Sequence, residues 1–301
     1  MQSIASAFLA ALLLSATPLV QPAPGFPAGD PTSSSVSGVT VTAPKKGAVQ
    51  DFIWRAGSKT SDGQLARWHT DVCPSSTGLP EVYDAYFDQR LRDIAKSVKA
   101  QVATSTCTPN ILIYFTPDPD KTLAGLRLKN SWMFGGENPA ILASDIKAKM
   151  PIFWTHNVTP MPSDGAPGDV YCSVGRCILQ VHAEFASRLQ SSVVDSMGVV
   201  AVIVDTHKVK GLSFASLSSY IAMISLAQFN GAAIGPSMPT ILNLFKDREA
   251  GRPIPTDLTD WDIAYLRGLY STDADISASL QRSEIYQRLK LGPGIADDPP
   301  R

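Results

Sequence analysis

The chain has few of the residues on which metal and nucleophile chemistry most often depends. Its 301 residues include only four histidines and four cysteines. The histidines show no H-E-x-x-H spacing and the cysteines show no paired C-x-x-C spacing, so the common zinc motifs are missing. The sequence also has no G-x-S-x-G elbow, P-loop, dinucleotide-binding glycine pattern or EF-hand loop. We therefore expect no cofactor and no metal site.

An excess of charge of either sign is also missing. The chain has 26 Lys and Arg against 27 Asp and Glu, which gives a formal net charge of −1. No run of basic residues is longer than the pair Lys45–Lys46. Surfaces that bind nucleic acid or anionic membranes need clustered basic residues. The sequence therefore predicts no nucleic-acid partner.

Long apolar runs are absent except at the N-terminus, where one extends from Ile4 to Val20. Its position and its Leu/Ala-rich composition are typical of a secretory signal, so residues 1–21 are predicted to be a signal peptide. An uncleaved N-terminal anchor is the alternative, although Pro18 interrupts the run and its length is at the lower limit for a span. We expect no transmembrane span after removal of the signal, and a secreted or periplasmic location.

Residues 22–50 are rich in Pro, Gly, Ser and Thr, which predicts a disordered leader. Within it, residues 36–45 (VSGVTVTAPK) look like the segment that bacterial outer-membrane receptors add as a strand to a periplasmic protein partner. The alternative is that this Val/Thr alternation only reflects the composition of a linker. We expect a single domain over 51–291, with a subdomain break near 159–169 as an alternative, and a flexible tail over 292–301.

The remaining patterns mix strands and helices without regular alternation, which predicts an α+β fold with a mixed sheet and a helical C-terminal third. Strands are expected at 65–72, 110–115, 151–158 and 198–205, with a hairpin over 170–185. Helices are expected at 80–100, 119–129, 139–149, 185–196, 213–230, 259–270 and 277–290. The unbroken β-branched run at 198–205 favours a strand buried on both faces, and the uncharged helix at 213–230 favours burial on more than one side.

The four cysteines are an even set in a chain with an export signal, which favours two disulfides. Cys172 and Cys177 flank a tight hairpin turn, where neighbours on opposite strands lie at bridging distance. That leaves Cys73 to pair with Cys107, which ties the segment before the first long helix to the loop after it.

Four residues are the only candidates for catalysis. His182 and Glu184 match half of the zinc deaminase signature, but no downstream P-C-x-x-C completes the metal site. The alternative is that they are polar residues on the exposed face of a half-exposed strand. Asp205 and His207 follow the buried strand, where active-site residues often lie. A single Asp-x-His at that position more commonly turns the chain. Asn157 lies in an N-x-T sequon, which is a glycosylation site only if the host performs that modification.

The C-terminal third resembles a family of secreted proteins of Gram-negative bacteria and, more distantly, a metallopeptidase family with a zincin-like fold. The matching residues of the last element are Leu258, Thr259, Asp262, Leu266, Leu269 and Tyr270, and Ile241 and Asn243 match a preceding short segment. The resemblance implies a helix with paired glutamates before these elements. Here that helix is 213–230, which has no Asp, Glu or His, so no catalytic residue carries over.

Two functions follow as expectations. The first is a secreted or periplasmic, non-catalytic protein that acts in binding or in upkeep of the cell envelope. The second is a zincin-like or other hydrolase with a divergent active site, for which His182, Glu184, Asp205 and His207 would be the residues to examine.

Overall fold

The computed structural model describes residues 44–56, 64–104, 106–134, 150–164, 169–173, 176–180, 190–229 and 238–291, with the backbone alone for 169–173 and 176–180. Its α-helices are α1 (Lys46–Ala56), α2 (Glu81–Ser97), α3 (Pro119–Lys129), α5 (Phe214–Leu226), α6 (Leu244–Glu249), α7 (Asp260–Leu269) and α8 (Ala278–Leu291). Its strands are β1 (Pro74–Thr77), β2 (Ile111–Thr116), β3 (Ile152–Pro162), β4 (Asp169–Ser173), β5 (Arg176–Gln180) and β6 (Val193–Asp205). Two short 3-10 helices are η1 (Ser131–Phe134) and η2 (Ile241–Asn243).

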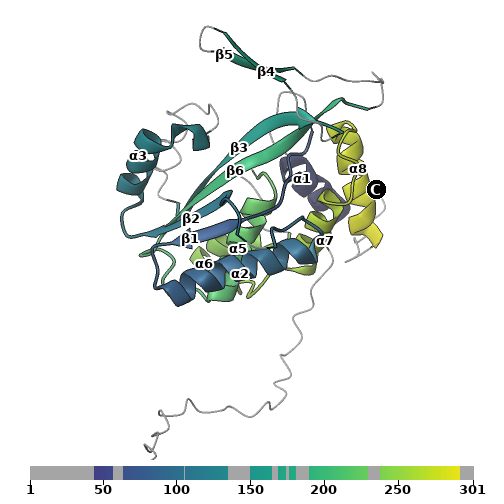
Figure 1. Cartoon of the computed structure of the whole chain (residues 1–301). Helices are drawn as coiled ribbons and strands as arrows, with labels where there is room; N and C mark the ends of the chain where they lie inside the picture. The colour runs from purple at the N-terminus through teal and green to yellow at the C-terminus, as the bar shows by residue number, and fades with distance from the viewer. Residues whose placement is uncertain are drawn as a thin grey trace, which may run out of the picture. The chain divides into compact units, whose positions relative to one another are not determined.

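Four strands form one mixed sheet in the order β1-β2-β6-β3 (Figure 1). The three strands β1, β2 and β6 are parallel, and β3 runs antiparallel to β6. The strands β4 and β5 pair with each other as a separate hairpin. After β6 the described chain contains helices only. The predicted α+β class, with a mixed sheet and a helical C-terminal third, is confirmed.

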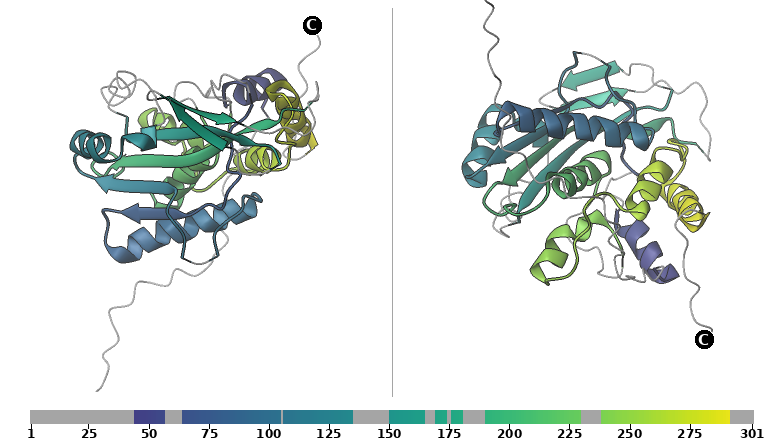
Figure 2. Two further views of the ribbon diagram at one scale, coloured as in Figure 1. Left: turned by 45° about the horizontal axis from the view of Figure 1, so that its top comes forward. Right: turned by 90° about the horizontal axis from the view of Figure 1, so that it is seen from below.

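Both faces of the sheet are buried, because successive residues of β6 point alternately into two apolar clusters. The larger cluster contains Val200, Val202 and Val204, and the smaller one contains Val199, Ala201 and Ile203. The helices α2 and α5 lie on the larger cluster's face, whereas α3 and η1 cover the other (Figure 2). The prediction that this strand is buried on both faces is therefore confirmed.

The end of β1 depends on one glycine. Gly78 has a φ of +107°, and a Cβ built on it would lie 2.0 Å from the carbonyl oxygen of Phe115. Any other residue would both strain the backbone and collide with β2. The chain can therefore leave β1 and turn into α2 only with glycine at this position.

The helix at 213–230 has the burial that its sequence predicts. The helix α5 begins after Ser213, whose hydroxyl accepts a hydrogen bond from the backbone N–H of Ser216 at 3.0 Å. Every residue from 216 to 226 is buried, and α5 contacts α2, α7, η2 and β6. Phe214 departs from the expected buried face, since it is 41% exposed at the end of the helix.

A capping box lies at the start of α7, and it does more than cap the helix. Thr259 and Asp262 exchange the two capping hydrogen bonds, at 3.1 and 2.9 Å. The fully buried carboxylate of Asp262 also accepts from the hydroxyl of Thr240 at 2.5 Å and from the N–H of Ile241 at 2.8 Å. Burial raises the pKa of Asp262, and these hydrogen bonds oppose that rise. Asp262 thus fastens η2 to α7.

The disulfide Cys73–Cys107 is present as predicted, joining the residue before β1 to the segment before β2 across a separation of 34 residues. Cys172 and Cys177 are directly opposite each other in the register of the β4–β5 hairpin. That backbone arrangement is the one that a cross-strand bridge requires. The second disulfide stays a prediction.

The strand predicted at 65–72 is wrong. Its only sheet-like pairings are two single bridges, Arg67 with Ser196 and Val72 with Val102. The segment instead passes between β6 and the C-terminal helices, and Leu65, Ala66, Arg67 and Trp68 are all buried. The indole of Trp68 donates a hydrogen bond to the carbonyl of Ser225 in α5 at 2.8 Å. The alternating pattern therefore reflects burial on all sides and not a half-exposed strand.

Two strands are longer than predicted. The strand β3 continues through 159–162, where a subdomain break was the alternative, and β6 begins at Val193, so the helix expected over 185–196 is wrong from 193 onward. Two prolines in β3 favoured a loop, but Pro160 and Pro162 pair opposite β6 on an edge strand. Edge strands tolerate proline because one row of backbone N–H groups needs no partner. The expected helix 139–149 lies outside the described residues.

The leader ends earlier than predicted. The helix α1 begins at Lys46, whereas disorder was expected to residue 50. Val49, Phe52 and Ile53 are buried in the larger apolar cluster at a spacing that suits one helix face. The helix packs against α8, where the guanidinium of Arg282 lies 4.7 Å above the ring of Trp54. The folded part of the chain therefore includes residues from the predicted leader.

Candidate functional site

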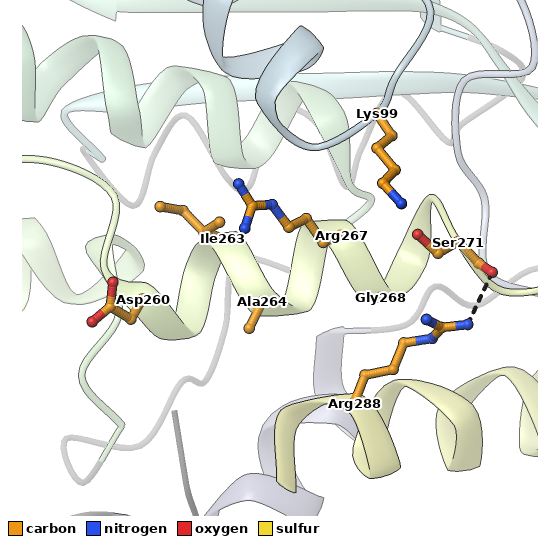
Figure 3. A pocket seen from close by; sticks show the side chains of 8 residues that line it. All are labelled: Lys99, Asp260, Ile263, Ala264, Arg267, Gly268, Ser271 and Arg288. Atoms are coloured by element: carbon orange, nitrogen blue, oxygen red, sulfur yellow. Dashed lines mark hydrogen bonds between the residues drawn. The ribbon is translucent and has the colours of Figure 1, made fainter. Parts of the chain in front are cut away.

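A pocket of about 580 Å³ lies beside α7, where the turn after α2 and the end of α8 approach this helix (Figure 3). It is lined by Lys99, Asp260, Ile263, Ala264, Arg267, Gly268, Ser271 and Arg288. Its volume is within the range of roughly 300–1,000 Å³ that small-molecule sites occupy. The pocket therefore has the size of a site for a small ligand.

The floor of the pocket is one face of α7. Ile263, Ala264, Arg267, Gly268 and Ser271 recur at intervals of three and four, so they share a face at the helical period. A Cβ on Gly268 would lie 3.3 Å from two side-chain carbons of Ile285. Glycine at this position lets α8 pack closely on α7, which sets one wall of the pocket.

Lys99 supplies the opposite wall from an unusual backbone conformation. It follows α2 in the left-handed region, with a φ of 69°, and no other non-glycine residue of the described chain has a positive φ. Asparagine and glycine adopt this conformation at helix ends far more readily than lysine does. The local fold alone would therefore favour a different residue at position 99.

The two arginines are held in place by backbone carbonyls. The Nε of Arg267 donates to the oxygen of Ser97 at 3.1 Å, and an Nη of Arg288 donates to the oxygen of Ser271 at 3.2 Å. A guanidinium has five N–H donors. Each side chain is thus oriented by one hydrogen bond and keeps further donors for a ligand.

The pocket carries an excess of positive charge. Within the described chain, no ion pair joins Lys99, Arg267 or Arg288 to a carboxylate, whereas Arg90 and Arg252 elsewhere on the surface are paired with Asp257 and Asp247. Asp260 is the only acid among the described residues of the lining, and Figure 3 shows it at the far end from Lys99 and Arg288. It precedes Arg267 by seven residues, or about 10 Å of helix. The cationic end of the pocket is therefore not neutralised from within.

Asp205 and His207, two of the predicted candidates, lie at the C-terminal end of β6. Asp205 is buried, and its carboxylate accepts from the backbone N–H of His207 at 2.9 Å and pairs with Lys208 at 3.4 Å. Its carbonyl accepts from the N–H groups of Lys208 and Val209. These contacts turn the chain after the strand. Neither Asp205 nor His207 lines the α7 pocket.

His182 and Glu184, the other two candidates, lie outside the described residues, so their position relative to Asp205 and His207 is not defined. Among the described residues, no group of three or more His, Cys, Asp and Glu side chains is placed to hold a metal ion.

His69 and His156 were not among the catalytic candidates, and burial lowers the pKa of both. His156 donates from Nε2 to the carbonyl oxygen of Ile224 at 2.7 Å, since a carbonyl can only accept. Burial lowers the pKa of His156 to about 4. Burial, and then the neighbouring Arg67, lower the pKa of His69 to about 4. Both imidazoles are therefore neutral at physiological pH.

The residues of the pocket were not predicted from the sequence. Its three cations come from positions 99, 267 and 288, and no spacing rule connects residues so far apart. The signals that could have pointed to them are local. Position 99 follows a helix where glycine or asparagine is more common, and Ala264 and Gly268 form a small-residue pair four apart on the face of α7.

Comparisons of the chain with known protein families, with curated proteins and with solved structures find no match. In the part of the chain that the structure describes, no helix has the length and apolar character that crossing a membrane requires.

Proposed function

We propose that this protein is an exported binding protein, secreted or periplasmic, that takes a small ligand in the α7 pocket and does not transform it. The observation that carries the proposal is the composition of the lining. The described residues of the lining include three cations, an apolar part of the floor and a single distant carboxylate, and none of them is a histidine or a cysteine. Hydrolytic sites usually need a base within reach of a nucleophile or an activated water. This lining is suited to recognition.

Export is supported by two further features. The predicted signal at 1–21 addresses the chain to an oxidising compartment, and the Cys73–Cys107 disulfide is the kind of cross-link that persists there. The short segment 36–45 would act, in this proposal, outside the folded domain as a strand offered to a partner protein.

We also propose that the likeness to the zincin-like family is one of scaffold. Asp262, Thr259 and Ile241 are among the residues that carry the likeness, and all three take part in one hydrogen-bonded junction between η2 and α7. Their contacts here stabilise the fold. The hydrolase alternative would place its chemistry on His182, Glu184, Asp205 and His207.

Two measurements test the proposal. Expression of the full chain in a Gram-negative host should yield periplasmic or secreted protein with a new N-terminus near residue 22, and intact cytoplasmic protein beginning at Met1 would contradict export. A thermal-shift screen of small metabolites should then find a stabilising ligand, and Ala264→Trp, which would fill the pocket, should abolish that shift. A hydrolase activity that is lost in His182→Ala and Glu184→Ala would favour the alternative.

A further inference from the structure

We infer that the α7 pocket takes an organic anion with about two negative charges and a short apolar group. This inference rests on the proposed binding function and names its ligand class. Among the described residues of the lining, three cations against one acid leave an excess of two positive charges. Like charges held together repel unless a counter-charge is present, and a ligand of opposite charge supplies it.

The arginines alone would not carry the inference. Helix C-termini attract basic side chains in general, and Arg267 and Arg288 lie in the last turns of α7 and α8. The more specific fact is that both arginines line the same pocket, from opposite sides of α7 in Figure 3. Each arginine is fixed by a backbone carbonyl that uses one donor, so the remaining donors are pre-oriented for an oxyanion.

Lys99 gives the independent observation. A left-handed backbone is unfavourable for lysine, and the residue that best fits the turn is glycine. The left-handed conformation belongs to the turn that ends α2, in which the N–H groups of Lys99 and Ala100 donate to the carbonyls of Lys96 and Ala95. The lysine side chain lines the pocket opposite Arg288 in Figure 3. The chain thus keeps a cation in the pocket where the fold would favour glycine.

The ligand's shape follows from the floor. Ile263, Ala264 and Gly268 give a shallow apolar surface next to the cationic end. A dianionic head, either a phosphomonoester or a dicarboxylate, would contact Lys99, Arg267 and Arg288, and a small apolar group would lie over Ile263 and Ala264. An oligonucleotide or an anionic membrane is too large for a pocket of about 580 Å³.

Isothermal titration calorimetry with three probes tests the inference on the mature protein. Phenyl phosphate and phthalate represent the two head groups, and benzyl alcohol is an uncharged counterpart. We expect at least one anion to bind, with an affinity that weakens as salt is added, and benzyl alcohol not to bind. The stronger of the two anions identifies the head group. Shifts of the Ile263 and Ala264 methyl signals in NMR spectra should accompany binding.

Lys99→Gly is the decisive variant, because it removes the positive charge and places glycine, which favours a positive φ, at this position. Anion affinity should fall about tenfold to a hundredfold, as for loss of one charge-assisted hydrogen bond. The melting temperature should change little, since relief of strain opposes the added freedom of the unfolded chain. Arg267→Gln should weaken binding similarly. Lys129→Gln, at the exposed end of α3, is the charge-matched control and should bind like wild type.

Equal anion binding by wild type and Lys99→Gly would overturn the inference, as would benzyl alcohol binding as tightly as the anions. If an uncharged ligand from the screen shifts the Ile263 and Ala264 signals while both anions fail, the ligand class is wrong and the binding function stands. If no ligand of any class shifts these signals, the proposed function fails as well.

Discussion

Replacing Ile221 by alanine tests whether α5 serves the core. Ile221 is completely buried at the middle of the helix, within the larger apolar cluster. The substitution removes three carbons, worth about 2.4 kcal/mol at roughly 0.8 kcal/mol per buried methylene group. The cavity left between rigid neighbours adds to this loss, so the free energy of unfolding should fall by about 3–4 kcal/mol. For a domain of this size the melting temperature should fall by about 6–16 °C.

Ser225 provides a matched control one turn further along the same helix. It is as buried as Ile221, and its hydroxyl has no hydrogen-bond partner in the described structure. Ser225→Ala should therefore leave stability unchanged or raise it, because it removes a buried polar group that has no partner. Its carbonyl, which accepts from the indole of Trp68, is kept in the variant.

Both variants can be measured by urea denaturation followed by circular dichroism, with tryptophan fluorescence as a second probe of the same transition. The reasoning would be refuted if Ile221→Ala melted like wild type. If that variant also lost binding to a partner, α5 would be a docking surface and the core assignment would be wrong.

Three further changes test other parts of the fold. Replacing Cys73 and Cys107 together by alanine should lower the free energy of unfolding by about 3–4 kcal/mol, because the bridge closes a loop with a separation of 34 residues; an unchanged urea midpoint would contradict this. Burial lowers the pKa of His156 from 6.5 to about 4, so the unfolded chain binds a proton first as the pH falls. Stability that is complete above pH 6.5 should thus be lost towards pH 4, by about 3 kcal/mol at most. His156→Gln should reduce that slope and leave the share of His69, which titrates in the same window. Asp262→Ala should cost about 3 kcal/mol or more, since several buried donors lose their acceptor, and Asp262→Asn should cost less because its amide oxygen can still accept; equal losses in urea denaturation would contradict this, because they would show that a neutral acceptor does not replace the carboxylate.

The parts of the fold that the sequence predicts well are those whose signal is local. The β-branched run before Asp205 could only be a strand buried on both sides, and the pair Thr259 and Asp262 marks the start of α7. The sequence did not predict the two hydrogen bonds that Asp262 accepts from Thr240 and Ile241. That contact depends on how η2 meets α7, which no pattern within either segment encodes.

The failures share a physical cause, which is that tertiary contacts overrode local preference. Pro160 and Pro162 indicate a loop when taken alone, yet an edge position in the sheet accommodates them. The alternating residues around Arg67 indicate a strand, yet contacts on all sides replace the sheet partner. The α7 pocket could not be predicted at all, because Lys99 and Arg288 are brought together only by the packing of α2, α7 and α8.

The packing of α1 on α8 brings the entry and the exit of the folded part onto neighbouring helices (Figure 2). A domain whose first and last helices are neighbours is suited to insertion into another protein and to circular permutation. It can be spliced into a surface loop of a host protein without spreading the two cut ends apart, or its ends can be joined by a short linker and the chain reopened elsewhere.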